Sequence, residues 1–449
     1  MCQNLPLLLA SALGLVLSCL TGPVEAANDL LETYQAARTN DPRFQVAFYE
    51  YEAAKEAIPQ ARAELLPGVT LDLRGAETKQ NILDRNQAIF GEGRTRFTTK
   101  SYSFQASQPL FRVSSWQRLR QAKTTVKQAF ALFAVAEQQL LRRSAEAYLI
   151  VLAARDNVAL SKAELAAVGR QLELVKARRR GGLANITDEY EAQARYSRVQ
   201  ADVFAGTNTL DDAYQGLREV VGDAVVDIYP FREDIPMVTP DPPNVSSWID
   251  MALDQNWSLL AANYAVTVSE QEIKRRRASH FPTLDLVART GNIDSGGAIT
   301  GGGSDVDTTE VALQLTIPLF AGGGISSLTR QAQSDHRRAI EERRLQHRIV
   351  MRETRAAFQS LSSAISRVAA LRDSLRSQES ALGGREQGYR SGVNTLLDVL
   401  DAQRDLNATR RDYYTARYDY LMNLLRLKEQ VGALSENDLA YINQFLNRT

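Results

Sequence analysis

The hydrophobic residues of this chain follow a helical period over two long stretches. Beyond Phe111, apolar residues recur every three or four positions from Leu119 to Val175, and no proline interrupts them before Gly181-Gly182. This spacing places them along one side of an α-helix. A helix of roughly 65–70 residues would be about 100 Å long. Residues 321–388 carry a similar, less regular pattern, so we predict a second long helix there.

Four shorter segments alternate between apolar and polar residues, which is typical of strands with one apolar face. The alternating apolar residues are Val69, Leu71 and Leu73; Tyr102, Phe104 and Ala106; Leu284 and Leu286; and Val311, Leu313, Leu315 and Ile317. Residues 291–307 are rich in Gly, Ser and Asp, and we expect a solvent-exposed loop there. Residues 28–64 have a helical composition and precede the first strand.

The chain contains an internal duplication. Residues 182–222 align without a gap with residues 392–432, at an offset of 210 positions, so that Asp188 falls on Asp398. Each half reads as a helix, two strands, a very long helix and another helix. The predicted divisions are a signal peptide at 1–26, a first repeat at 27–222, a linker at 223–246, a second repeat at 247–432 and a C-terminal segment at 433–449.

The N-terminus resembles a secretory signal peptide. An apolar run from Leu5 to Leu20 is followed by Gly22-Pro23 and a small-residue cleavage site ending at Ala26. Both cysteines, Cys2 and Cys19, lie in this segment, so cleavage after Ala26 leaves a mature chain without cysteine. Cleavage before Cys19 with lipid attachment is the alternative.

Composition argues against an enzyme. The chain has 53 basic and 53 acidic residues and only three histidines, and it contains neither a GxxxxGK[ST] nor an HExxH motif. We therefore expect no catalytic residues, no metal and no cofactor. The basic runs at 178–180 and 274–277 are interpreted as solvated helix faces, and no nucleic acid is expected as a partner.

Four strands with an apolar outer face cannot close a barrel within one chain. Unpaired backbone groups are not tolerated in a membrane, and barrels need about eight or more strands. Two chains would supply eight strands and three would supply twelve. The pattern therefore predicts an exported homo-oligomer, with a composite membrane barrel and a long helical extension into water.

Several segments resemble the TolC family of outer-membrane channel proteins. They are residues 389–403 (YRSGVNTLLDVLDAQ), 318–323 (PLFAGG), 281–286 (FPTLDL) and 182–188. The resemblance implies a mainly α-helical fold with long antiparallel helical hairpins. It also implies a homotrimer in the outer membrane whose twelve-stranded barrel, four strands per chain, stands above a twelve-helix periplasmic tunnel. A periplasmic adaptor and an inner-membrane ABC or proton-driven pump would be its partners.

The turn between the last two helices of each repeat lies far from the strands. Asp398 and Asp401 are three residues apart and share a helix face. In a trimer they would give six carboxylates around one constriction, which favours cations and raises carboxylate pKa values. The resemblance makes these two residues the selectivity rings of the aperture. Acidic residues that only complement the helix dipole are the alternative.

The resemblance also implies a gate that holds the tip closed. Thr187, Asp188 and Tyr389 would form its contacts, and Asn394 stands where a basic gate residue is expected. Arg390 or the run at 178–180 are candidate substitutes for that basic residue, and an ordinary N-cap is the alternative role of Thr187.

The sequence thus predicts a passive outer-membrane channel for type I protein secretion or for efflux of small toxic molecules. A lipid-anchored drug or metal efflux channel is one alternative, favoured by acylation of Cys19. A soluble periplasmic coiled-coil scaffold is the alternative from another class. That scaffold would account for the helical periodicity but leaves the duplicated strands unexplained.

Overall fold

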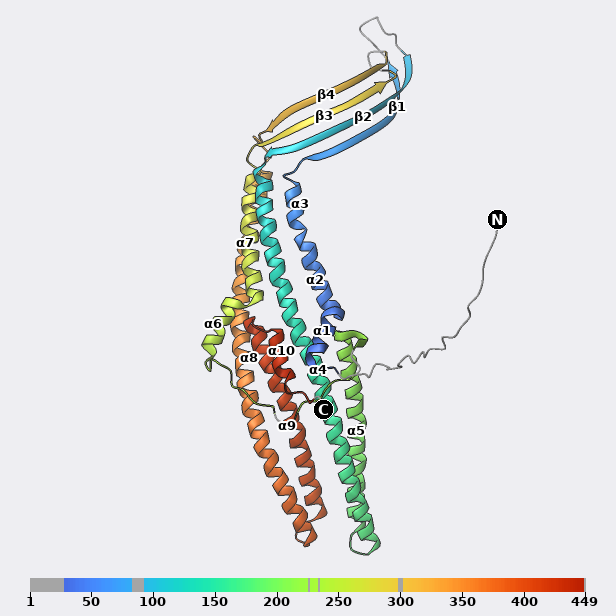
Figure 1. Ribbon diagram of the computed structural model, residues 1–449, viewed down its shortest axis with the longest axis vertical. Coiled ribbons are helices and arrows are strands. Elements are labelled where there is room, and N and C mark those ends of the chain that lie inside the picture. Colours follow the sequence, from blue (N-terminus) through green and yellow to red (C-terminus); the bar gives the residue numbers. More distant parts are fainter. Residues whose placement is uncertain (1–27, 83–92, 225–226, 233–234, 298–301, 448–449) are drawn as a thin grey trace, which may run out of the picture.

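The computed structural model describes residues 28–82, 93–224, 227–232, 235–297 and 302–447. The predicted signal peptide, with Cys2 and Cys19, lies outside these residues. Along its long axis the protein has a β-sheet at one end and two helical hairpins at the other (Figure 1). Between them lies a middle section where segments from both ends of the chain meet.

The two predicted long helices are present. Helix α4 spans Val113–Arg180 and has 68 residues, and α8 spans Gly324–Arg390 and has 67. The second begins at 324 rather than 321 because Gly322 and Gly323 have φ values of 58° and 79°. This left-handed backbone is outside the α-helical region, so the helix starts only after it.

Shorter helices run alongside these two. Helix α5 (Ile186–Val221) returns along α4, and α9 (Leu396–Val431) returns along α8. Towards the sheet, α4 is covered by α1 (Leu30–Asn40), α2 (Pro42–Lys55) and α3 (Ala57–Ala63). In the second half, α6 (Val245–Gln255) and α7 (Trp257–Ala278) pack on α8. The long antiparallel hairpins of the predicted fold are therefore confirmed.

The expectation of one helix over residues 28–64 is wrong in detail. The segment is divided at Asp41, whose backbone is extended and whose side chain accepts from the N–H groups of Arg43 and Phe44 to cap α2. A residue before proline avoids the helical region, and here Pro42 follows. Asn256, which no proline follows, also has an extended backbone and divides α6 from α7. Its Oδ1 accepts from the N–H of Leu259 and so caps α7.

The four strands form one antiparallel sheet in the order β1 (Gly68–Ile82), β2 (Gly93–Phe111), β3 (Thr283–Ser295) and β4 (Ser304–Thr316). The predicted apolar face is present. Leu71 lies opposite Phe104, and Leu286 lies opposite Leu313. Most of this face is exposed in the single chain, and the outer edges of β1 and β4 have no strand partner within the described residues.

The exposed loop predicted at 291–307 is shorter than expected. Strand pairing continues through this polar segment, where Gly291 pairs with Thr308 and Asp294 with Asp305. Ladder hydrogen bonds come from the backbone, so polar side chains do not end a strand that is paired on both sides. Ile317, by contrast, lies just beyond the end of β4.

The main core lies in the middle section. Tyr148 of α4 and Leu425 of α9 are fully buried there, together with Ile442 of α10 (Glu436–Asn443). The backbone N–H of Leu30 donates to Oδ1 of Asn443, 413 residues away, at 3.0 Å. Isolated β-bridges pair Ile228 of the connecting segment with Asn28, and Phe231 with Leu446. Both residues of the connecting segment therefore pack into this core.

Candidate aperture at the helical tips

Two tight turns form the end of the molecule opposite the sheet (Figure 1). Helix α4 ends before Gly182 and α8 ends before Gly392, with φ values of 75° and 81°. The N–H of Leu183 donates to the carbonyl of Arg178 at 2.8 Å, and Val393 repeats this bond to Gly388 at 2.8 Å. Both glycines therefore close a helix C-terminus with left-handed backbone, which other residues adopt at a cost.

Asp398 lies in the first turn of α9 and is bonded there. Its Oδ2 accepts from the backbone N–H of Thr395 at 2.8 Å, and its own N–H donates to the Thr395 hydroxyl oxygen at 3.2 Å, which together form a capping box. The Thr395 hydroxyl also donates to Oδ2 at 2.7 Å. These bonds, with a smaller contribution from Arg385, hold the pKa of Asp398 below its ordinary value. Crowding of carboxylates in an oligomer would oppose this lowering. The increase in carboxylate pKa predicted from the sequence therefore applies to the assembly and stays a prediction.

The duplicated turn in the first half has the same design. Asn185 is the residue before α5, and its backbone N–H donates to Oδ2 of Asp188 at 3.2 Å. Thr187 is the second residue of α5 and is exposed, so Asn185 occupies the cap position. Asp188 and Asp398 therefore have equivalent local roles at the two helix starts.

Asp401 lies one turn further along α9 and has a cationic neighbour. Arg404 Nη1 is 3.4 Å from Asp401 Oδ1, and the same guanidinium reaches Asp405 at 3.2 Å. Asp398 has Arg385 at 4.0 Å. The two carboxylates are partly exposed, and each is close to an arginine, which partly compensates its charge.

Tyr389 joins the two hairpins near their tips. Its ring lies 4.9 Å from the guanidinium carbon of Arg178 on α4, and it packs beside a small apolar cluster that includes Leu172 and Leu396. A cation over an aromatic face is attracted by the ring electrons. A groove of about 460 Å³ beside this contact is lined by Arg178, Tyr389 and Arg390. Arg178 and Arg390, two of the candidate substitutes for the basic gate residue, are therefore next to Tyr389.

Asn394 acts locally in this chain. Its Nδ2 donates to the carbonyl of Arg385 at 3.3 Å, and a Cβ on Gly388 would lie 2.4 Å from that nitrogen. Over the described residues, no hydrogen bond or ion pair joins Asp188 to Tyr389 or Asn394. The single chain thus places the predicted gate residues at the two tips, and their gate contacts stay a prediction for the oligomer.

A buried carboxylate not identified from the sequence connects three helices above the tips. Glu164 of α4 has a side chain that is only 3% exposed, and it accepts from Arg195 of α5 at 2.6 Å and from Arg411 of α9 at 3.0 Å. The signal available in the sequence was a charged residue beside the apolar stripe of α4. Its two partners become apparent only in the folded chain.

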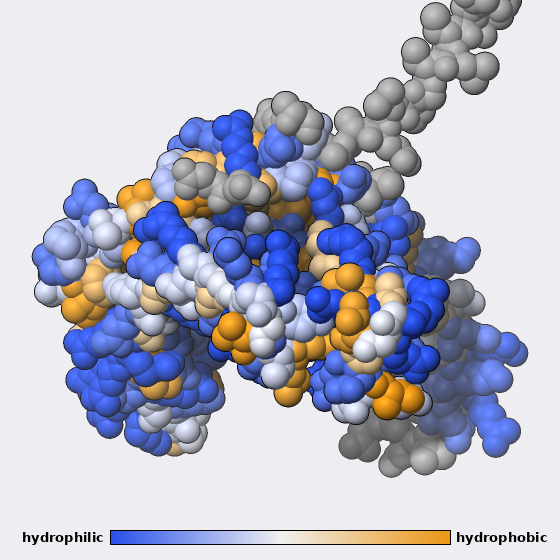
Figure 2. Space-filling model, turned by 90° about the horizontal axis from the view of Figure 1, so that it is seen from below, coloured by the Kyte–Doolittle hydropathy of each residue, from blue (hydrophilic) through white to orange (hydrophobic). Residues whose placement is uncertain are grey.

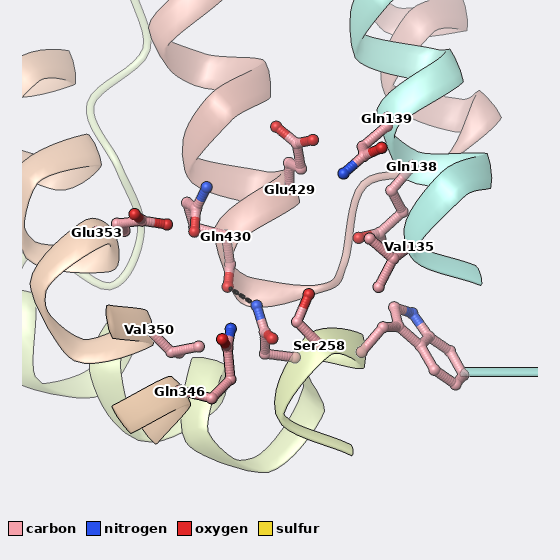
Figure 3. A pocket seen from close by; sticks show the side chains of 11 residues that line it. Val135, Gln138, Gln139, Ser258, Gln346, Val350, Glu353, Glu429 and Gln430 are labelled. Atoms are coloured by element: carbon pink, nitrogen blue, oxygen red, sulfur yellow. Dashed lines mark hydrogen bonds between the residues drawn. The ribbon is translucent and has the colours of Figure 1, made fainter. Parts of the chain in front are cut away.

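A polar cavity of about 150 Å³ lies in the middle section (Figure 3). Gln138, Glu353 and Glu429 are among its lining residues, and Asn256 Nδ2 donates to the carbonyl of Gln430 at 2.8 Å. Burial raises the pKa of Glu429, and the nearby positive charge of Arg142 reduces this increase. No group of three or more potential metal-ligating residues occurs in the described parts of the chain. None of the described helices combines the length and hydrophobicity needed to cross a membrane.

Comparison with known proteins gives a consistent result. The family model described as outer membrane efflux protein matches residues 33–223 and 248–433. The chain is 33% identical over 446 residues to the outer membrane protein TolC of Vibrio cholerae, which covers 98% of this chain and 97% of that protein. It is 29% identical to the alkaline protease secretion protein AprF of Pseudomonas aeruginosa, covering 92% and 86% of the two chains.

Solved structures agree on the fold. The Campylobacter jejuni CmeC outer membrane channel superimposes with a TM-score of 0.75 at 15% identity, covering 99% of this chain and 98% of that one. CusC superimposes with a TM-score of 0.77 at 17% identity, covering 90% and 92%. These structures contain a helical tunnel joined to a β-barrel.

Proposed function

Because the chain belongs to the outer membrane efflux protein family, the TolC family, we propose that it forms a trimeric outer-membrane channel that exports cargo passively. The observation that carries this proposal is the sheet. It has an apolar face, two edges without a strand partner in the described residues, and short connections to helices of 68 and 67 residues. Three chains with four strands each would give a barrel of twelve strands, within the size range of membrane barrels.

The energy for transport would come from a partner. The sequence has no GxxxxGK[ST] loop, so an inner-membrane pump would energise export. We place the docking of a periplasmic adaptor at the hairpin turns, where Leu183 and Val393 occupy equivalent positions and are exposed. Seen from the side of these turns, the surface is mostly hydrophilic with separate hydrophobic patches (Figure 2). Contiguous exposed apolar patches mark protein contacts, and a trimer would gather three copies of each of these two residues at one end.

Two classes of cargo fit this channel. AprF and the protease secretion protein PrtF of Dickeya chrysanthemi, which is 28% identical, point to protein secretion. The outer membrane protein OprJ and the efflux protein BepC are more distant, at 24% and 27% identity, and BepC is by its name an efflux protein. The higher identity and coverage of the secretion proteins favour protein cargo. Loss of secreted protease activity on deletion of this chain, without a change in drug sensitivity, would support that choice.

The aperture is proposed at Asp398 and Asp401. Both carboxylates are partly exposed on one face of α9 near its turn, and three chains would bring six of them together. Thr187, Asp188, Tyr389 and Asn394 are proposed as gate residues because they lie at the same two turns. Asp398→Asn with Asp401→Asn should lower the cation-to-anion permeability ratio in planar bilayers. Asp373→Asn, an exposed carboxylate of α8, is the control.

The first test is the native mass of the protein extracted in mild detergent. A trimer of subunits that begin at residue 27, with conductance in bilayers, would support the proposal. Trimers that begin at an acylated Cys19 would keep the channel and favour the lipid-anchored alternative. A monomer found only in the soluble periplasmic fraction would overturn the proposal in favour of a scaffold.

A further inference from the structure

The start of α4, next to the sheet, carries positive charge that the chain does not compensate (Figure 1). Residues 112–136 contain five basic residues and no acidic one, although the whole chain has 53 of each. Two of the five have carboxylate partners: Arg112 lies 3.0 Å from Asp285 Oδ2, and Arg118 pairs with Glu64. The other three are exposed and have no ion pair within the described residues; they are Arg120, Lys123 and Lys127.

An aromatic side chain lies on the same side of α4 as these cations. Trp116 is 55% exposed and precedes Arg120 by four residues and Lys123 by seven, so the three lie along one side of the helix. Another side of α4 contacts α3 and α7 of the same chain, where Gln121 Nε2 donates to Glu272 Oε2 at 3.1 Å. The side of α4 that carries Trp116, Arg120 and Lys123, which we call the Trp116 side, is therefore left exposed.

The Trp116 side faces away from the interior of a tunnel. Each residue of an α-helix turns the chain by about 100°, so Leu141 and Ala145 lie within about 60° of Arg120 around the axis of α4. Both are buried in the core of the middle section, together with Ile442 of α10. A hollow tunnel cannot occupy the space that a packed core fills. The Trp116 side is therefore on the outside of the molecule.

The Trp116 side also lies at the level of a membrane surface. Phe111 is the last residue of β2, so Trp116 and Arg120 are about 8 Å and about 14 Å beyond the sheet along α4. The headgroup layer next to the hydrocarbon core is roughly 5–8 Å thick. Helical side chains lean towards the N-terminus of their helix, which here is the sheet, so the side chains of Arg120 and Lys123 extend towards this layer. Tryptophan is enriched at the same depth.

The duplicated half repeats the cation. Adding the offset of 210 to Arg120 gives Arg330 on α8, which is exposed and has no ion pair over the described residues. The equivalent residues Ala122 and Ala332 are both buried, so the two helices are oriented alike at this level. Residues 317–334 contain no acidic residue. Both long helices thus have an uncompensated arginine at the same distance from the sheet.

We infer that Trp116, Arg120 and Lys123 bind the phosphate of an anionic phospholipid in the membrane leaflet next to the helices. Arg120 and Lys123 hold the phosphate, and Trp116 lies beside the glycerol and the first part of the acyl chains. This inference rests on the proposed membrane channel and adds a lipid class to it. The exposed apolar face of the sheet adjoins the site, which favours a lipid over a soluble polyanion. Two cations near a membrane surface should favour an anionic lipid over a zwitterionic one by about tenfold or more.

Native mass spectrometry of the detergent-extracted protein tests this preference. Phosphatidylglycerol should bind about tenfold more tightly than phosphatidylcholine, and Arg120→Gln with Lys123→Gln should abolish the difference. The matched control is Lys162→Gln with Arg198→Gln, two exposed cations of α4 and α5 in the hairpin far from the sheet, which should keep it. Equal affinity of the unmodified protein for both lipids would overturn the inference. Inorganic phosphate binding as tightly as phosphatidylglycerol would also overturn it, because the lipid would then contribute nothing.

The position of Trp116 gives a second test. The chain has three tryptophans, so Trp248→Phe with Trp257→Phe leaves Trp116 as the only one. In nanodiscs, phospholipids with a nitroxide on the headgroup should quench its fluorescence, and aqueous iodide should quench it weakly. Quenching by iodide without quenching by the nitroxide would place Trp116 in water and overturn the inference, while the channel proposal stands. A single-subunit native mass, with no insertion into nanodiscs, would overturn both.

Discussion

Glu164 gives the most direct test of how the two hairpins are held together. Replacement by Gln keeps the size of the side chain but removes the charge that Arg195 and Arg411 share. Breaking a fully buried ion pair costs about 3–5 kcal/mol, because the remaining charge stays uncompensated. Arg411 is 33% exposed and water can solvate part of its charge, so we expect a loss of about 2–3 kcal/mol.

Amide hydrogen exchange measures this loss where it occurs. A tenfold change corresponds to about 1.4 kcal/mol, so amides of α5 and α9 beside Glu164 should exchange roughly 30–150 times faster in Glu164→Gln. If opening separates the hairpins, resting conductance should rise as well. The control is Glu379→Gln, whose partner Arg410 is 2.9 Å away at a partly exposed site. We expect less than about 0.5 kcal/mol there. Equal exchange rates in the two variants would refute the reasoning.

Three further predictions concern the tips and the pH response. Tyr389→Ala, which removes the ring beside Arg178, should raise resting conductance in bilayers, whereas Tyr389→Phe should leave it unchanged. An equal rise in Tyr389→Phe would assign the effect to the hydroxyl and not to the ring. Gly392→Ala should cost about 1–2 kcal/mol at its φ of 81°, and Gly392→Asn less, measured by local hydrogen exchange. Burial of Glu272 is outweighed by arginine hydrogen bonds that lower its pKa to about 2. The ion pairs of Glu272 therefore add about 1 kcal/mol, after screening, to the free energy of unfolding at pH values above its ordinary pKa of 4.5. This stabilisation is lost as the pH falls towards 2, so Glu272→Gln should make the free energy of unfolding depend less steeply on pH over that range.

Much of the architecture could be predicted because its signals are local and repeated. The spacing from Leu119 to Val175 is enough to define a long helix, and the duplicated Gly182 and Gly392 mark its turns. The division at Asp41 was also encoded, since an acidic cap directly precedes a proline. The loop at 291–307 was overestimated because side-chain polarity says little about backbone pairing when both neighbours are strands.

The site could be predicted less completely. The capping box of Thr395 and Asp398 is a local signal, because all its parts lie within four residues. The contact of Arg178 with Tyr389 and the cluster around Glu164 join residues that are far apart in sequence. Their partners depend on how two hairpins lie beside each other, and periodicity alone does not fix that arrangement.

The bond from Leu30 to Asn443 has a consequence for the order in which the protein forms. An exported chain emerges with its N-terminus first, so Leu30 reaches the far side of the inner membrane long before Asn443. The middle section needs both, together with the buried residues of α10 such as Ile442. A first repeat that has emerged alone therefore has an incomplete core and exposes apolar surface. The middle section closes only after the last residues have crossed, which delays assembly until translocation is complete.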